Sequence, residues 1–381
     1  MEKFKMAFIG AGGRANAVHY PSFADLDDVE IVGICDIDLN RLKETADKYN
    51  VPEDHRYGAG GIYDYRNMIK DLKPDGVAVI GQPHIMYDIW MWCLENGVNL
   101  YVEKPLGLNV HQARMLTEMA RRHDCITMCT LQRRTTPSVM KLREECLKHG
   151  PITSALVRFY KCDINDRFDA RDHMYDDTVH AIDAVRWACG DSELVKLESH
   201  VNNIGTHDIN YISATLHFEN GSIGYLINSW SSGRRVFDIE MHAPGVCAEV
   251  EHEVGGYLYE NGDYNGKYFS SAECAGGDDF HVATGVRYLA RNFVDSCRNH
   301  TRSCSDFENA LKGIEIADMI LGKALPFGVL MMGALRIGMV SFAEVSAFGI
   351  GTYPMYLAAV YPLLILFCLM SMALHGRAAG K

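Results

Sequence analysis

Apolar runs alternate with helical patterns through the first third of the chain. Each run is a short stretch of the kind that is buried in parallel sheets, and a stretch with apolar residues at helical spacing follows it. The predicted strands are residues 5–9, 30–35, 76–80, 98–102 and 126–131, and the predicted helices are residues 39–49, 63–72, 85–95 and 110–123. This alternation predicts an α/β domain built on a doubly wound parallel sheet.

The pattern changes at about residue 150. Short strands with alternating apolar and polar residues now follow one another across turns, at 155–160, 196–201, 211–218, 222–229, 237–242 and 247–251. Strand runs without helices between them predict a largely antiparallel sheet and hence an α+β domain. We expect a dinucleotide-binding domain at 1–125, with elements to about 150, and a substrate-binding and oligomerisation domain at 126–325.

An atypical apolar tail, residues 326–381, follows a predicted helix at 307–320. From 348 through 374 no side chain is charged, and this stretch is long enough to span a bilayer. Three interpretations stand for the tail: a membrane anchor, an apolar oligomerisation arm, or unrelated sequence that a frame change has introduced. Membrane contact is therefore expected only through residues 348–374.

An excess of acidic residues narrows the class of ligand. The chain has 49 Asp and Glu against 37 Lys and Arg, a net charge of −12, which argues against broad binding to nucleic acid or anionic lipid. A small molecule is the expected ligand. Twelve cysteines without a CxxC pair, and no signal peptide before the first strand, favour a cytoplasmic protein, and the sequence predicts no metal site.

A glycine-rich turn joins the first predicted strand to the helix after it. Gly10 permits the tight turn, Gly12 lets the backbone approach a pyrophosphate, and Gly13 and Arg14 open a helix whose N-terminus favours anions. The second strand ends at Asp36, where a carboxylate can bind ribose hydroxyls and repel a 2′-phosphate. The spacing favours NAD over NADP, and the alternative is that Asp36 only caps the next helix.

An acid, a base and a proline follow the fourth predicted strand. Because the carboxyl ends of parallel strands face the ligand crevice, Lys104 should point at the bound ligands, and Pro105 restricts its direction. Glu103 is expected to anchor the turn beside the cofactor. The alternative is that Glu103 and Lys104 form a solvated charge pair on a loop.

Two further strand ends carry polar residues. Gln82, Pro83 and His84 follow the third predicted strand, where they contact the cofactor or, equally, cap the helix that starts there. Arg133 and Arg134 follow the fifth predicted strand. They are candidates for holding a substrate hydroxyl or phosphate, with solvated surface charge as the alternative.

One predicted helix of the second domain carries a histidine between acids. Asp176, His180 and Asp183 are spaced so that they can share one helix face. A histidine beside a carboxylate is a credible general base, because its titration range suits removal of a proton from an alcohol near neutral pH. Asp183 is a further candidate for substrate binding. The alternative is a helix-capping acid followed by a histidine in the core.

With these motifs in this order, the chain resembles the Gfo/Idh/MocA family of glucose-fructose oxidoreductases and inositol dehydrogenases over about residues 4–325. The motifs are Gly10-x-Gly12 with Asp36, Glu103-Lys104-Pro105, and Asp176-x-x-x-His180-x-x-Asp183. The resemblance implies a Rossmann domain, a tightly held nicotinamide, and a second domain whose open sheet faces the cofactor or a partner subunit. It also implies association into homo-oligomers, with Lys104, His180 and Asp176 as catalytic residues.

The resemblance further implies an NAD(P)-dependent oxidoreductase that acts on a CH–OH group of a sugar, cyclitol or related compound. The expected cofactor contacts are Gly10, Gly12, Gly13, Arg14, Asp36, Gln82, Pro83, His84, Glu103 and Lys104. The segment 163–175 lacks the glycine-rich approach of many relatives, which leaves the substrate class open. Two alternatives remain: a glycoside hydrolase that uses NAD transiently, and a catalytically silent member that senses a ligand and binds another protein.

Overall fold

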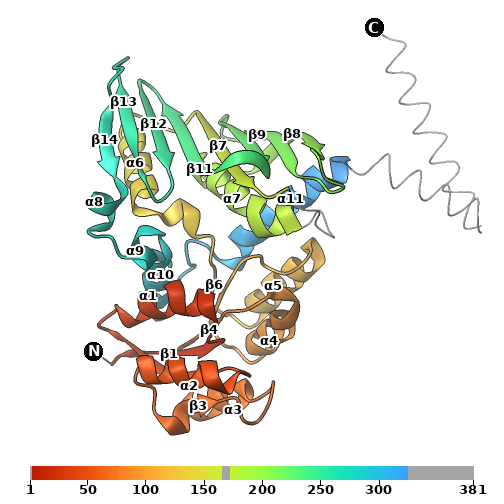
Figure 1. Cartoon of the computed structure of the whole chain (residues 1–381), viewed down its shortest axis with the longest axis vertical. Coiled ribbons are helices and arrows are strands. Elements are labelled where there is room, and N and C mark those ends of the chain that lie inside the picture. The colour runs from red at the N-terminus through yellow and green to blue at the C-terminus, as the bar shows by residue number, and fades with distance from the viewer. Residues whose placement is uncertain (1, 165–171, 325–381) are drawn as a thin grey trace, which may run out of the picture. The chain divides into compact units, whose positions relative to one another are not determined.

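The apolar runs of the first third form the predicted parallel sheet. In the computed structural model, which describes residues 2–164 and 172–324, six parallel strands lie in the order β3-β2-β1-β4-β5-β6 (Figure 1). They are β1 (Phe4–Ile9), β2 (Val29–Cys35), β3 (Arg56–Tyr57), β4 (Gly76–Val79), β5 (Leu100–Val102) and β6 (Thr127–Cys129). The chain reverses its direction of winding between β1 and β4, and ligands bind sheets of this kind at the carboxyl ends of the strands beside that point.

Helices cover both faces of this sheet, since alternate residues of β1 enter two separate cores. Side-chain caps explain where two of the helices begin. Asp38 accepts bonds from the backbone N–H groups of Asn40 and Arg41, and Asn109 accepts one from Gln112. The helices are the π-helix Ala15–His19 with α1 (Tyr20–Ala24), α2 (Leu39–Lys48), α3 (Tyr65–Leu72), α4 (Pro83–Glu95) and α5 (Val110–Arg122).

A helix from much later in the chain, α10 (Val286–Asn299), completes this layer. Its Phe293 packs edge-on against the rings of Phe4 and Tyr101, with centroids 6.5 and 5.6 Å away. The layer built on the first sheet therefore contains strands β1 to β6. It also contains α10, which follows the second sheet in the sequence. The expected domain boundary at residue 125 lies just before β6.

The second sheet has eight strands in the order β14-β13-β12-β11-β7-β10-β9-β8. Every neighbouring pair is antiparallel except β7 with β10, which confirms a largely antiparallel sheet. The apolar pattern missed β13 and β14. The strands are β7 (Ser154–Cys162), β8 (Leu194–Asn202), β9 (Tyr211–Phe218), β10 (Ile223–Ser229), β11 (Ser231–Ala243), β12 (Val246–Glu251), β13 (Gly255–Glu260) and β14 (Lys267–Ser270).

One face of the second sheet carries helices. Along β11, Ile239 and Met241 are buried, while Glu240 and His242 between and beyond them are partly exposed on the other face. Helix α6 packs on β11, β12 and β13, and α7 packs on β7 and β10. The helices of this half are α6 (Pro137–Leu147), α7 (Val179–Ala188), α8 (Ser271–Ala275), α9 (Phe280–Ala283) and α11 (Phe307–Ala324).

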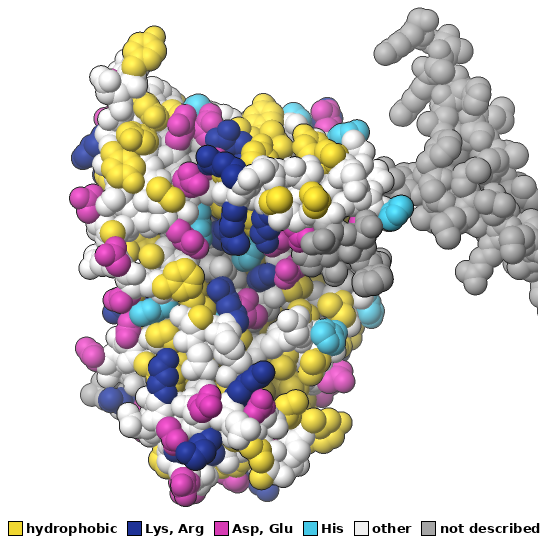
Figure 2. Space-filling view, viewed as in Figure 1, with side chains coloured by type: hydrophobic (Ala, Val, Ile, Leu, Met, Phe, Trp, Pro, Cys, Tyr) yellow, Lys and Arg dark blue, Asp and Glu magenta, His cyan; other side chains and the backbone are white. Residues whose placement is uncertain are grey.

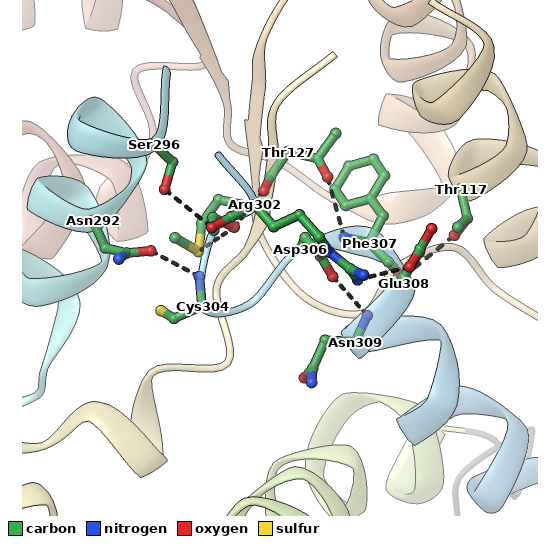
Figure 3. A network of polar contacts seen from close by, with 12 residues as sticks. Thr117, Thr127, Asn292, Ser296, Arg302, Cys304, Asp306, Phe307, Glu308 and Asn309 are labelled. Atoms are coloured by element: carbon green, nitrogen blue, oxygen red, sulfur yellow. Dashed lines mark hydrogen bonds and ion pairs between the residues drawn. The ribbon is translucent and has the colours of Figure 1, made fainter. Parts of the chain in front are cut away.

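The turn between α10 and α11 is fixed by polar contacts to α10 and β6 (Figure 3). The backbone N–H of Cys304 donates to Oδ1 of Asn292 at 2.8 Å, and that of Phe307 donates to Oγ1 of Thr127 at 3.1 Å. Asp306 caps the start of α11 by accepting the backbone N–H three residues on, at 2.8 Å. These bonds hold α11 against β6, the strand that leads into Arg133 and Arg134.

Residues up to 321 belong to one compact unit that contains both sheets. The apolar tail at 326–381, with its stretch 348–374, lies outside the described residues. Within 2–164 and 172–324, no helix combines the length and apolar character that crossing a membrane requires.

Candidate active site

The glycine-rich turn after β1 leaves room for a ligand. Gly10 has φ +107°, and a Cβ there would lie 2.1 Å from the carbonyl oxygen of Ile80, so only glycine fits. At Gly12 and Gly13 an added Cβ would meet nothing within 4 Å. The turn is closed against the end of β4 at Gly10 and open where the helix begins. A pyrophosphate fits such a cradle, because backbone N–H groups and the helix N-terminus favour anions.

Asp36 at the end of β2 lies against this turn. Its Oδ2 accepts the backbone N–H of Ala11 at 2.6 Å, and its Oδ1 accepts that of Asp38 at 2.8 Å. The cap of α2 is Asp38, so the helix-capping alternative for Asp36 is wrong. Each carboxylate oxygen can accept a second bond, and Asp36 is partly exposed, so it still offers acceptors to ribose hydroxyls.

Glu103 is buried beneath the same turn, at 6% exposure. Its Oε1 accepts bonds from Nε of Arg14 at 2.9 Å and from Nε2 of His19 at 2.7 Å, and its Oε2 accepts the backbone N–H of Lys104 at 3.1 Å. Burial alone would raise the pKa of Glu103, but the His19 hydrogen bond and the Arg14 charge outweigh it and hold the pKa below its usual range. Glu103 therefore links the glycine-rich helix to the turn that carries Lys104.

The ammonium group of Lys104 reaches the segment before α7. Its Nζ donates to the main-chain oxygen of Asp176 at 2.6 Å and to the carboxylate Oδ1 of the same residue at 2.5 Å. The Lys104 side chain is 18% exposed and that of Asp176 62% exposed, so the pair lies at the rim of the site. The Lys104–Pro105 peptide bond is cis. The solvated-loop alternative fails here, because the partner of Lys104 is Asp176 and the neighbouring Glu103 is buried.

Asp176 belongs to a π-helix, Asp172–Thr178, that precedes α7. The shared helix face predicted for Asp176, His180 and Asp183 is wrong: Asp176 is exposed, while the other two residues are buried. The reason is that a π-helix has more residues per turn than an α-helix, so the side chains before residue 179 lose the α-helical register.

The neighbouring acid, Asp177, turns inward. Nζ of Lys161 donates to its two carboxylate oxygens at 2.7 and 2.6 Å, and Nε1 of Trp230 donates to Oδ2 at 3.0 Å. Burial alone would raise the pKa of Asp177, but the Lys161 charge and hydrogen bond outweigh it and lower the pKa. This contact fixes the π-helix on the second sheet and leaves Asp176 facing Lys104.

His180 lies in the first turn of α7 and is 4% exposed. Its Nδ1 has no hydrogen-bond partner among the described residues. Burial lowers the pKa of His180 well below its usual value, and the charges of Arg133 and Lys104 lower it further. The imidazole is therefore neutral at pH 7, which is the state that a general base needs.

Arg133 is buried between aromatic rings of the second sheet. Its guanidinium lies 4.3 Å from the ring centroid of Phe237 and 4.7 Å from that of Phe159. The residue is 8% exposed, and its Nε has no hydrogen-bond partner in the described part of the chain. Burial and the nearby charge of Arg235 lower the pKa of Arg133 to about 10. The surface-charge alternative for Arg133 is therefore wrong.

Arg134 points the other way and pairs with Asp183 in the core. Its Nε lies 3.2 Å from Oδ2 of Asp183, and its Nη2 donates to the main-chain oxygen of Cys304 at 2.6 Å. Both residues are 1% exposed. Burial raises the pKa of Asp183 to about 6, against the opposing charge of Arg134. The pair joins α7 to the turn before α11, and its burial places both side chains in the core rather than in a substrate site.

Gln82, Pro83 and His84 stand at the carboxyl end of β4, beside the glycine-rich turn. Gln82 occupies the N-cap position of α4 without a side-chain cap bond, and Pro83 is the first helical residue. His84 follows in the first turn, so it is not the cap. Gln82 and His84 are exposed, which leaves their side chains available to a cofactor.

Basic side chains gather across the middle of the face in Figure 2. The cationic side chains whose charges lower the pKa of His180 or of Arg133 include Arg14, Lys104 and Arg235. The site is thus rich in cations although the whole chain has a net charge of −12. The sequence patterns missed several of its residues, because no local motif marks them: His19, Lys161, Trp230, Arg235 and His252.

One group in the described residues has three side chains of metal-ligand type within reach of one another: Glu240, His242 and Cys247 on β11 and β12. Nε2 of His242 already bonds Oε1 of Glu240 at 2.7 Å. The group shares no residue with the site around Lys104 and His180.

The domain that carries the glycine-rich turn matches a known family. Residues 4–131 match the Gfo/Idh/MocA model, which describes an oxidoreductase family with an NAD-binding Rossmann fold. Over this domain the chain is similar to the family. The predicted resemblance to this family and the predicted α/β architecture are confirmed.

Individual proteins extend the comparison. A D-glucoside 3-dehydrogenase of Escherichia coli is 24% identical over 254 residues, which cover 60% of this chain and 70% of the relative. Glycosyl hydrolase family 109 protein 2 of Akkermansia muciniphila is 32% identical over 130 residues, 33% of this chain and only 27% of the relative. The crystal structure of a dehydrogenase from Chromobacterium violaceum has a TM-score of 0.75 and 20% identity, and covers 88% of this chain and 99% of that one. The last similarity shows a shared fold.

Proposed function

We propose that this Gfo/Idh/MocA oxidoreductase transfers a hydride between NAD and a CH–OH carbon of a sugar, cyclitol or related polyol. The observation that carries the proposal is that the Lys104 ammonium group, at the carboxyl end of β5, bonds Asp176 and that its charge lowers the pKa of buried His180. A neutral base beside a cation is what alcohol oxidation needs next to a nicotinamide. The E. coli relative named D-glucoside 3-dehydrogenase supports a carbohydrate substrate.

Each catalytic side chain handles one proton or charge in this proposal. Neutral His180 accepts the proton of the substrate hydroxyl. Lys104 donates a hydrogen bond to the developing alkoxide, and Asp176 holds the ammonium group in place through its 2.5 Å contact. The nicotinamide, when bound, supplies the hydride acceptor.

The same proposal assigns the cofactor contacts. Gly10, Gly12, Gly13 and Arg14 would hold the pyrophosphate, with Gln82, Pro83, His84, Glu103 and Lys104 nearer the nicotinamide. NAD is preferred over NADP because the Asp36 carboxylate, held in place by two backbone N–H groups, would repel a 2′-phosphate.

We extend the proposal to the whole chain. Residues 1–125 bind the cofactor, residues 126–325 supply the substrate site, and the open face of the second sheet joins subunits into a homo-oligomer. We place the protein in the cytoplasm, with any membrane contact confined to 348–374.

A panel of sugars, cyclitols and their oxidised forms tests the proposal, with absorbance of the reduced nicotinamide read for both NAD and NADP. We expect turnover of at least one polyol, and a higher kcat/KM with NAD than with NADP. The absence of turnover with every panel member, in a protein that binds NAD, would contradict it.

A glycoside hydrolase that uses NAD transiently is the second candidate, and the name of the A. muciniphila relative favours it. That relative is matched over 27% of its length, against 70% for the dehydrogenase, so support for hydrolysis is narrower. Release of free sugar from a glycoside without a net change in NADH absorbance would favour the hydrolase. A silent sensor would bind ligand and show neither reaction.

A further inference from the structure

We propose that the substrate carries an anionic group, a carboxylate or a phosphate, which Arg133 binds beside His180. The inference rests on the proposed function of this site and narrows its substrate class to acidic sugars, which comprise sugar acids and sugar phosphates.

The first ground is the state of the Arg133 guanidinium. It is buried, and its Nε has no hydrogen-bond partner in the described residues. The rings of Phe159 and Phe237 stabilise the cation through their faces, at 4.7 and 4.3 Å, but offer no acceptor to its N–H donors. Leaving a buried charge without a partner is costly, and a planar oxyanion would satisfy the donors in pairs.

The second ground is that the nearby acids already have other partners. Glu253 and Asp177 are the two acids whose charges raise the pKa of Arg133. Asp177 accepts two bonds from Lys161, at 2.7 and 2.6 Å. Glu253 lies 3.3 Å from Nδ1 of His252. Neither acid hydrogen-bonds or ion-pairs with Arg133 in the described part of the chain.

The third ground is a cluster of like charge. Arg235 and Arg14 both act on Arg133 and lower its pKa. Arg235 is exposed in the irregular part of β11, where the register with β7 shifts. Figure 2 shows Lys and Arg side chains gathered along the middle of one face of the molecule. Cations that lie close together attract an anionic ligand.

The cofactor's pyrophosphate does not account for Arg133. The glycine-rich turn with Arg14 belongs to the first sheet, whereas Arg133 packs on Phe159 of β7 and Phe237 of β11 in the second. Among the neighbouring charges, that of Arg133 lowers the pKa of His180 the most. An anion on Arg133 would therefore lie on the substrate side, where the charge of Arg133 already acts on the proposed base.

The experiment compares acidic and neutral sugars of one skeleton: D-glucuronate, D-glucose 6-phosphate and D-glucose, each with NAD. We expect the wild-type protein to prefer one acidic sugar by about tenfold to a hundredfold in kcat/KM, the value of a charge-assisted hydrogen bond. The two acidic arms decide between carboxylate and phosphate. Arg133→Gln should lower the preference by the same factor, and Arg133→Lys should keep part of it.

Arg122→Gln is the matched control, because it removes an exposed arginine that pairs with Glu118 on α5, and it should leave the preference intact. Equal kcat/KM for acidic and neutral sugars, or a preference that survives Arg133→Gln, overturns the inference and leaves the oxidoreductase proposal standing. If Arg133→Gln does not fold, Arg235→Gln carries the test and should lower the preference several-fold, and an unchanged preference overturns the inference.

Calorimetric titration of the same three sugars into the NAD-loaded protein separates the two proposals. Binding of an acidic sugar that weakens in Arg133→Gln, without any NADH formed, supports the anion site and contradicts the proposed function. The absence of binding by both acidic sugars, in a protein that turns over a neutral one, overturns the anion site alone.

Discussion

Nζ of Lys104 donates to Asp176 twice, to its main-chain oxygen at 2.6 Å and to its carboxylate at 2.5 Å. The contact joins the turn after β5 to the π-helix before α7. Because two acceptors of one residue hold it, the ammonium group has a defined position at the carboxyl edge of the parallel sheet. Glu103 supports it from below by accepting the backbone N–H of Lys104.

Substitution of two glycines in the glycine-rich turn should have different effects. Gly10→Ala should lower the free energy of unfolding by roughly 2–4 kcal/mol, because the new Cβ would meet the oxygen of Ile80 at a strained φ. Gly12→Ala is the matched control for folding, since its Cβ enters open space, but it should weaken NAD binding about tenfold. Thermal unfolding and NAD titration check both variants. Equal decreases of the melting temperature in the two variants would contradict the claim that only glycine fits at position 10.

Glu103→Gln should destabilise the protein by about 3 kcal/mol, because it leaves Arg14 and His19 without their buried partner. The control is Glu118→Gln, an exposed acid on α5 that should change little. Urea unfolding measures both free energies. A loss no larger than that of the control would show that Glu103 does not anchor the turn.

The same carboxyl predicts a pH dependence of stability. The pKa of Glu103 is lowered by folding, so its stabilisation is present above the unfolded pKa of about 4.5 and is lost as the pH falls below that value toward the folded pKa. Urea unfolding between pH 3 and pH 7 should therefore show a steeper acid loss in the wild-type protein than in Glu103→Gln, and parallel curves would contradict this.

The lowered pKa of His180 should set the acid limit of activity. Because its pKa lies well below 6.5, the imidazole stays neutral, and kcat/KM for alcohol oxidation should hold constant as the pH falls through 6.5. Arg133→Gln removes a charge that lowers this pKa, so the decline should move to higher pH in the variant. A pH profile of both proteins checks the shift, and a wild-type decline centred at or above pH 6.5 would speak against His180 as the base.

The parallel half of the fold could be predicted because its signals are local. A buried strand, a glycine turn and a helix occupy consecutive residues, and the position of Asp36 follows from the length of that unit. Helix α10 could not be assigned to this layer from sequence, since Phe293 meets Phe4 and Tyr101 only through tertiary contact.

The site itself was harder to predict, and two neighbouring arginines show why. Arg133 and Arg134 share one short helical turn, yet Arg133 enters the site and Arg134 enters a buried ion pair. Only the elements packed on either side decide which way each points. The π-helix likewise moves Asp176 and His180 out of the α-helical register, which spacing alone does not reveal.

The central claim is that Lys104 acts on the substrate together with His180, and single-turnover hydride transfer in NAD-loaded Lys104→Met tests it most directly. With the polyol that the panel identifies, the rate of NADH formation should fall about 10²- to 10⁴-fold while the NAD dissociation constant changes less than about threefold. Lys141→Met, which removes an exposed lysine paired with Glu145 on α6, should leave the rate unchanged. A Lys104→Met rate equal to that of the wild-type protein would contradict the account.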